Sequence, residues 1–234
     1  MILSINQPSY LSWIGYYKRI LKSDIHLILD DVQIELRTKN SFTNRNKVKS
    51  KNGFIFLTIP LITYENRLPL INKVKIDNSQ KWQKKHLETI RQCYSKSPFF
   101  NDYFHLFEEA FSIHNEWIYL LDIINYFNNF IIDYFKLDNN VKIYKSSDIA
   151  TLNSKKNLIL EYCDYFKCTT YISGPLGQNY IDINDFNKRG IKLIFDDYVP
   201  KYYKQINGNF LERMTIFDLI FNLGKESRNF IENS

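Results

Sequence analysis

The chain has 234 residues, of which 44% are hydrophobic and 24% charged, and these values are typical of a globular protein rather than a disordered or fibrous one. Its length suits one large domain or one domain with an inserted part. The net charge is +6, from 31 basic and 25 acidic residues. Segment 37–51 accounts for this excess, because it contains six basic residues and no acidic one. These six are Arg37, Lys39, Arg45, Lys47, Lys49 and Lys51.

The sequence does not indicate export or membrane insertion. No basic stretch precedes an apolar run at the start, as a secretory signal would require. The longest apolar stretch, 117–135, is interrupted by Asp and Asn residues and is too polar to span a bilayer. Cys93, Cys163 and Cys168 form no C-x-x-C pair and fit reduced thiols packed as small hydrophobic residues. We therefore expect a cytoplasmic protein without a membrane span.

The first third of the chain alternates strand and helix patterns. Residues 2–5 are a short apolar run, 11–21 have apolar residues at helical spacing, and 25–29 are again mostly apolar. Strand, helix and strand in succession predict two parallel strands joined by a right-handed crossover. Further strands are expected at 54–60 and, more weakly, at 74–76.

The remaining chain contains a helical block and then a second alternating region. Residues 80–136 have helical periodicity and no strand pattern, so we expect a helical insertion or cap. The predicted fold is α/β, with a mostly parallel Rossmann-like sheet in a single domain, 1–234, and a helical subdomain at 80–136. After the block, strands are expected at 141–144, 169–172 and 191–195, and helices at 155–166, 182–189 and 215–223.

Polar side chains follow the expected strands at the points where these strands end. They are Asn6-Gln7, Asp30-Asp31 and Ser173-Gly174, with Asp196-Asp197 after a further strand. Because ligands of open α/β sheets bind at the carboxyl ends of strands, we expect these groups to meet at one edge. Asp30 and Asp31 point to opposite sides of an extended chain. Either one of them faces the site or the pair caps a following turn, and the sequence leaves both readings open.

Two further segments have side chains or backbone suited to an anionic ligand. Arg45 and Lys47, within Asn44–Lys47, match phosphate oxygens, and the two asparagines supply both donors and acceptors. A bound diphosphate is the favoured interpretation, with a nucleic-acid surface and a solvated loop as alternatives. The loop 173–177 has glycines that permit close approach of a ligand, but it lacks the ending of a P-loop, so an ordinary turn is the alternative.

The histidines give no metal signature. No H-x-x-x-H, H-E-x-x-H or Cys/His cluster is present, so no metal site is expected. His26 lies in an apolar strand and is expected to be structural. His86 shares a helical face with Trp82 and Ile90, a pattern typical of a core histidine, and it is also a candidate base.

Taken together, these motifs resemble the WbqC-like protein family almost from end to end. The matching segments are QPSYLSWIGYY at 7–17, SD at 23–24, LDDVQ at 29–33, NRNK at 44–47, LTIP at 57–60, KHL at 85–87, YSKSPFF at 94–100, SGP at 173–175, YID at 180–182 and TIFDLIFNLG at 215–224. The chain departs from many members at Asn6, where they have a histidine. A catalytic scheme that needs a base at this position is therefore not supported.

The resemblance implies a role in the biosynthesis of bacterial O-antigen or a related surface glycan. It favours transfer of an acyl or aminoacyl group from a carrier thioester, with an acyl-carrier protein as partner, to the amine of a nucleotide-linked amino sugar. Asp31 or His86 is the expected base, with Asp30 beside them, and no bound cofactor, metal or nucleic acid is expected. The expected substrate-binding residues are Gln7, Tyr10, Trp13, Asn44, Arg45, Asn46, Lys47, Lys96, Ser173, Gly174 and Tyr180.

Two alternatives belong to other functional classes. An ATP-dependent ligase or a nucleotidyltransferase would fit a first strand followed by a polar turn and an aromatic helix, although no HxGH pair is present. A non-catalytic protein that binds a nucleotide sugar or a nucleic acid would fit the net positive charge.

Overall fold

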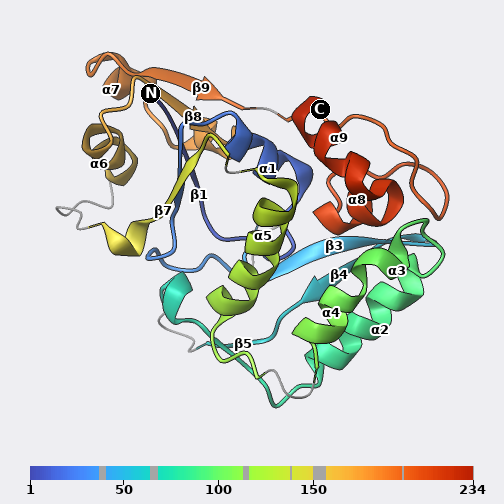
Figure 1. The fold of residues 1–234 in the computed structure, drawn as a ribbon. Helices are drawn as coiled ribbons and strands as arrows, with labels where there is room; N and C mark the ends of the chain where they lie inside the picture. The colour runs from blue at the N-terminus through green and yellow to red at the C-terminus, as the bar shows by residue number, and fades with distance from the viewer. Residues whose placement is uncertain are drawn as a thin grey trace.

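Five parallel strands form the central sheet, in the order β7-β2-β1-β8-β9 (Figure 1). The computed structural model describes residues 1–36, 41–63, 68–112, 116–137, 139–149, 157–196 and 198–233. The sheet starts at its centre with β1, extends to one side through β2 and β7, and then returns to the other side of β1 with β8 and β9. This doubly wound order confirms the predicted α/β fold with a parallel sheet. The strands are β1 (Ile2–Asn6), β2 (Ile25–Ile28), β7 (Lys142–Lys145), β8 (Thr170–Ser173) and β9 (Lys192–Phe195).

Helices cover both faces of this sheet. Successive side chains of a strand point to opposite faces, so neighbouring residues of β1 pack in different layers. On one face, Leu3 and Ile5 of β1 pack in a core with α6 (Leu158–Tyr165) and α7 (Ile183–Asn187). On the other face, Ser4 of β1 forms a 2.7 Å hydrogen bond with Nδ1 of His26 beneath α1 (Ile14–Leu21). His26 is fully buried, as expected for a structural histidine.

The larger core lies outside the sheet and joins α1 to the helical block. The Tyr17 hydroxyl of α1 donates a 2.6 Å hydrogen bond to Asn128 of α5 (Leu120–Phe135). Phe107 and Phe127 pack with Phe217 of α8 (Ile216–Leu223), so the helices predicted within 80–136 share one core with the C-terminal helices. The other helices are α2 (Trp82–Tyr94), α3 (Phe100–Tyr103), α4 (His105–Ala110) and α9 (Ser227–Asn233), and the 3₁₀ helices are η1 (Ile71–Lys73), η2 (Ser146–Asp148), η3 (Pro175–Asn179) and η4 (Gly224–Glu226).

Within the described part of the basic segment, residues 45–50 form a strand that the sequence analysis did not anticipate. β3 (Arg45–Ser50) pairs with β4 (Gly53–Thr58) as an antiparallel hairpin. Val48 and Leu57 of this hairpin are buried against the larger core, whereas Phe54 is 47% exposed. A second two-stranded sheet joins β5 (Leu61–Ile62) to β6 (Lys75–Ile76).

Several sequence predictions fall partly outside the described residues. They are the basic residues Arg37 and Lys39, the first part of the helix predicted at 155–166, and Asp197. Cys93, Cys163 and Cys168 are buried free thiols. No helix in the described part of the chain combines the length and apolar character needed to cross a bilayer.

Candidate functional site

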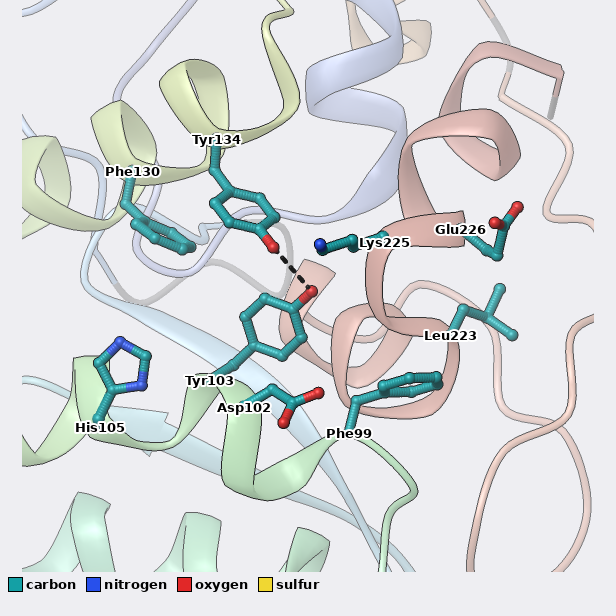
Figure 2. Close-up of a pocket in the computed structure, with 9 residues that line it drawn as sticks. All are labelled: Phe99, Asp102, Tyr103, His105, Phe130, Tyr134, Leu223, Lys225 and Glu226. Carbon is teal, nitrogen blue, oxygen red and sulfur yellow. Dashed lines mark hydrogen bonds between the residues drawn. The ribbon is translucent and has the colours of Figure 1, made fainter.

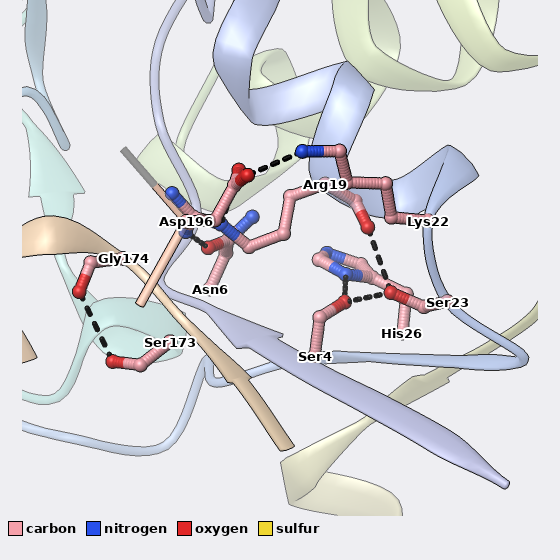
Figure 3. A network of polar contacts seen from close by, with 9 residues as sticks. All are labelled: Ser4, Asn6, Arg19, Lys22, Ser23, His26, Ser173, Gly174 and Asp196. Carbon is pink, nitrogen blue, oxygen red and sulfur yellow. Dashed lines mark hydrogen bonds and ion pairs between the residues drawn. The ribbon is translucent and has the colours of Figure 1, made fainter. Parts of the chain in front are cut away.

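The strand order reverses between β1 and β8, and the two strands end there in polar residues. In an open α/β sheet, such a reversal leaves a crevice at the carboxyl ends of the strands. Asn6 is the last residue of β1, and Ser173 is the last residue of β8 (Figure 3). The predicted meeting of Asn6 and Ser173-Gly174 at one edge of the sheet therefore corresponds to this crevice.

A buried arginine links the two strand ends. Arg19 of α1 is 7% exposed and donates a hydrogen bond from Nη1 to Oδ1 of Asn6. A Cβ atom at position 174 would lie 3.1 Å from both Nη atoms, so Gly174 gives the guanidinium room to pack against the backbone. Asp196, which directly follows β9, lies 3.8 Å from Nε of Arg19 and also binds Lys22. Burial lowers the pKa of Arg19, and Asp196 opposes this shift.

The contact with Arg19 determines which way the Asn6 amide points. A guanidinium can only donate hydrogen bonds, so the atom of Asn6 that faces it must be the oxygen. The Nδ2 group of Asn6 is then a buried donor, and it has no partner within the described residues. Because an unpaired buried donor costs free energy, an acceptor atom of a ligand placed against Asn6 would be favoured.

Asn6 lines a cavity of about 130 Å³ that has both aromatic and acidic walls. Trp13 and Phe42 form one wall, with ring centroids 5.7 Å apart. Gln7 and Glu35 also line the cavity, and both are exposed. The structure thus brings together two of the predicted binding residues, Gln7 and Trp13.

Tyr180, the residue after η3 on the β8 side of the sheet, does not line this cavity but interacts electrostatically with Glu35, which does. Its pKa is raised by desolvation, lowered by the charge of Arg19 and raised by that of Glu35. The phenol is therefore within electrostatic reach of both side chains, although the residue as a whole is 70% exposed. Tyr180 is in this way a third predicted residue near the cavity.

The predicted cations, Arg45 and Lys47, lie at the edge of the cavity, on the outer face of the β3–β4 hairpin. Nε of Arg45 donates a 3.1 Å hydrogen bond to the carbonyl of Ser41, which lines the cavity. Nζ of Lys47 lies 5.9 Å from the ring centre of Phe42 and 4.9 Å from that of Phe54. Both side chains are half-buried. An anion that extends out of the cavity would meet these two cations.

The two asparagines of the segment Asn44–Lys47 bind the backbone instead. Nδ2 of Asn46 donates to the carbonyl oxygens of Tyr10 and Leu11, at 3.1 and 2.7 Å. These bonds hold a turn in which Leu11 has a φ of +46°, an uncommon conformation for leucine. Nδ2 of Asn44 donates to the carbonyl of Ile59 at 2.9 Å. Asn46 therefore positions the hairpin against the chain that follows β1, whereas Asn44 links the two ends of the hairpin.

Asp30 and Asp31 connect the ends of β2 and β7. The Asp30 carboxylate is 1% exposed and accepts hydrogen bonds from Ser146 Oγ, the Ser147 backbone amide and Ser147 Oγ, at 2.8 to 3.0 Å. It thus ties the end of β2 to the start of η2, a distant segment rather than the turn that directly follows Asp31. Asp31 is half-buried and accepts from Ser146 Oγ. The pair lies one strand away from the reversal between β1 and β8.

His86 and Tyr10 lie in the larger core, which removes His86 from solvent. Its Nε2 donates to the carbonyl of Thr58 at 3.2 Å, and its Nδ1 accepts from the Tyr10 hydroxyl at 3.1 Å. Burial lowers the pKa of His86 to about 4, so the ring is neutral near pH 7. With both nitrogens occupied, His86 has no free atom to accept a substrate proton. Lys96 is exposed in the connection after α2 and does not line the cavity.

Three site residues were missed by the sequence analysis: Arg19, Glu35 and Phe42. A basic residue on the buried side of the amphipathic pattern at 11–21 was the available signal for Arg19. Glu35 and Phe42 flank segment 37–40 and belong to no regular element, so neither periodicity nor a motif marks them. Among the described residues, no group of His, Cys, Asp and Glu is arranged to hold a metal ion.

Comparison with known proteins gives a match over almost the whole chain. The model of the WbqC-like protein family matches residues 7–230, which confirms the resemblance seen in the motifs. A protein of Mycobacterium tuberculosis (strain ATCC 25618 / H37Rv), described as uncharacterized protein Rv1507c, is 28% identical over 240 residues, with 98% of this chain and 96% of that protein covered. No solved structure matches the chain.

Proposed function

Since the chain belongs to the WbqC-like protein family, we propose that it is a cytoplasmic transferase in the biosynthesis of a bacterial surface glycan such as O-antigen. Its acceptor is the amine of a nucleotide-linked amino sugar, and its donor is an acyl or aminoacyl thioester on a carrier protein. The observation that supports this proposal best is the buried Asn6–Arg19 pair at the strand reversal, beside a cavity with two cations at its edge.

The size of the cavity decides how such a substrate would lie. Ligand pockets usually measure about 300–1,000 Å³. The volume of about 130 Å³ is therefore too small for a whole nucleotide sugar and suits its sugar ring. In the proposed arrangement, the sugar contacts Asn6 and packs on Trp13. The diphosphate then lies outside, where Arg45 and Lys47 neutralise its charge.

The proposed reaction forms an amide by direct attack. The amine nitrogen bonds to the thioester carbonyl carbon, the carbon–sulfur bond breaks, and the sulfur leaves as a thiolate that takes up a proton. The nitrogen loses a proton to a carboxylate. We assign this role to Glu35, because it lines the cavity and is exposed. Asp31 is the second candidate, since it is only half-buried, and His86 has no catalytic role in this scheme.

The test combines binding and turnover. Amino sugars linked to UDP, GDP and dTDP are screened by thermal shift, because a ligand of the native state raises its melting temperature. Those that bind are incubated with short acyl and aminoacyl thioesters, and the products are analysed by mass spectrometry for an N-acylated sugar and an equal amount of free thiol. The proposal is wrong if no nucleotide sugar binds. It is also wrong if no thioester acylates a bound sugar, and pyrophosphate release when ATP is added would then indicate a ligase or a nucleotidyltransferase.

A nucleic-acid binding protein is the second candidate, and the hairpin is the observation that favours it. Phe54 and Phe56 are 47% and 37% exposed, and Arg45 lies 4.7 Å from the centre of the Phe56 ring. Exposed aromatic rings beside cations are typical of surfaces on which single-stranded bases stack. Titration with single-stranded oligonucleotides at two salt concentrations separates the candidates, since nucleic-acid binding weakens steeply with salt.

A further inference from the structure

A second cavity, of about 480 Å³, lies between the helical block and the C-terminal segment (Figure 2). Tyr103 comes from α3, Tyr134 and Phe130 from α5, and Lys225 from η4. None of its lining residues lines the cavity at Asn6. Its volume is within the range of small-molecule sites. It therefore has room for a ligand that the proposed transferase site does not account for.

The polar groups at the centre of this cavity are mainly donors. The hydroxyls of Tyr103 and Tyr134 lie 3.3 Å apart, and Lys225 points its amine toward this pair (Figure 2). Only one of the two phenol protons is used between them, so the pair keeps one O–H to donate. Within the described residues, Lys225 has no carboxylate at ion-pair distance. The centre of the cavity thus combines an ammonium with a free hydroxyl.

Apolar side chains form two sides of this cavity, and Asp102, His105 and Glu226 also line it. Phe130 stacks on Tyr134 with ring centroids 5.2 Å apart, and Phe99 and Leu223 form the opposite side. Gly224 shapes that side, because it has a φ of +56° and a Cβ there would lie 2.7 Å from the Phe99 ring. The apolar body of a ligand would fit between these walls while its polar end meets Lys225.

We propose that this cavity binds a small carboxylate with an apolar body. Lys225 and the tyrosine pair hold the carboxylate, and Phe99, Phe130 and Leu223 hold the body. A cation is disfavoured by Lys225. A doubly charged phosphate is disfavoured by Asp102, which lines the same cavity, and by Glu226. Glu226 points away from the hydroxyl pair and accepts a 3.0 Å hydrogen bond from Asn229, so it repels a singly charged carboxylate at the pair less than it repels a doubly charged phosphate (Figure 2).

The test uses ligands that share a body and differ in their polar end. Hexanoate and phenylacetate are titrated by calorimetry and by ligand-observed NMR, together with hexanol, hexylammonium and phenyl phosphate. We expect the carboxylates to bind at least tenfold more tightly than the other three. In Lys225→Met, which keeps the length of the side chain, the carboxylates should lose that advantage while hexanol binding stays the same. The matched control is Lys142→Met, which changes an exposed lysine of β7.

The inference does not depend on the proposed transferase activity, and failure of the inference can be distinguished from failure of the proposed function. Carboxylate binding should persist in Arg45→Ala, a variant at the edge of the other cavity. The inference is overturned if phenyl phosphate or hexylammonium binds as tightly as the carboxylates, if Lys225→Met retains the preference, or if none of the carboxylates binds. Circular dichroism confirms that each variant is folded before it is titrated.

Discussion

Arg19 donates a hydrogen bond to Oδ1 of Asn6, and this contact orients a buried amide at the point where the strand order of the sheet reverses. The remaining Nδ2 donor has no partner within the described residues. A buried donor without a partner costs about 1–3 kcal/mol. A ligand that accepts from Nδ2 recovers this cost, so the pair couples the stability of the site to ligand binding.

Asn6→Asp tests this relationship, because it replaces the unpaired donor by an acceptor of nearly the same shape. Arg19 keeps an oxygen to donate to, so we expect a small change in melting temperature. A ligand that accepts from Nδ2 would instead meet an oxygen, and its affinity should fall at least tenfold. Thermal shift and calorimetry with a nucleotide sugar measure the two effects. Unchanged affinity in a folded Asn6→Asp variant would remove Asn6 from the site.

Lys47 and Lys49 lie two residues apart in β3 but differ in burial, so mutation of Lys47 should change ligand binding and mutation of Lys49 should change stability. Lys47 is half-buried at the cavity edge, so Lys47→Ala should weaken nucleotide-sugar binding and its salt dependence with little change in stability. Lys49 is 1% exposed and donates to the carbonyl of Asn209. Lys49→Met should therefore lower the free energy of unfolding by about 1–3 kcal/mol. Urea unfolding and calorimetry on both variants provide the comparison, and equal effects on binding would contradict it.

The architecture was predictable from sequence because buried strands and amphipathic helices leave strong periodic signals. The apolar runs at 2–5 and 25–29 became β1 and β2, and the block at 80–136 became helices. Arg45–Ser50 was not predicted as a strand, because its alternation of charged and small residues gives little hydrophobic signal. Its register depends on burial of Val48 and on the bonds of Asn46 to Tyr10 and Leu11, which are tertiary contacts.

The sequence indicated which polar residues share one edge of the sheet, but not all of the residues that line the cavity there. The polar residues after β1 and β8 do lie at one edge of the sheet, because that placement depends only on topology, and their role in binding stays a prediction. His86 shares its helical spacing with core residues, and no sequence pattern reveals that both its nitrogens are occupied. Arg19 was missed for a similar reason, since a lone arginine in a helix gives no sign that its side chain reaches a strand end.

Glu35→Gln tests the assignment of the base. A positioned base contributes about 10²–10⁴-fold to a proton transfer. We therefore expect kcat to fall at least a hundredfold with little change in KM, and to recover partly at high pH, where hydroxide can accept the proton that the nitrogen loses. Asp31→Asn is the matched control and should keep most of its turnover. The opposite result, with Asp31→Asn inactive and Glu35→Gln active, would transfer the role to Asp31.

Asp30 should prove structural, because its buried carboxylate accepts three hydrogen bonds from Ser146 and Ser147. Asp30→Ala leaves these donors unpaired and should cost about 3 kcal/mol of unfolding free energy. Ser147→Ala removes part of the same network, so the double variant should lose less than the sum of the single losses. Urea unfolding measures all three. Turnover per folded molecule should stay unchanged, and loss of turnover in a folded Asp30→Ala variant would make Asp30 a functional residue.

The buried histidines predict a loss of stability in mild acid. Burial lowers the pKa of His86 to about 4 and that of His26 to about 3, whereas an exposed histidine titrates near 6.5. Below pH 6.5 the unfolded chain therefore binds protons that the folded chain does not, and stability falls as the pH decreases toward 4. Each histidine should contribute about 2 kcal/mol to the loss between pH 7.5 and pH 5. Urea unfolding across this range should show a shallower pH dependence in His86→Asn, even though the variant is less stable at pH 7.5. A pH dependence as steep as that of the unmodified protein would mean that His86 is protonated in the folded state.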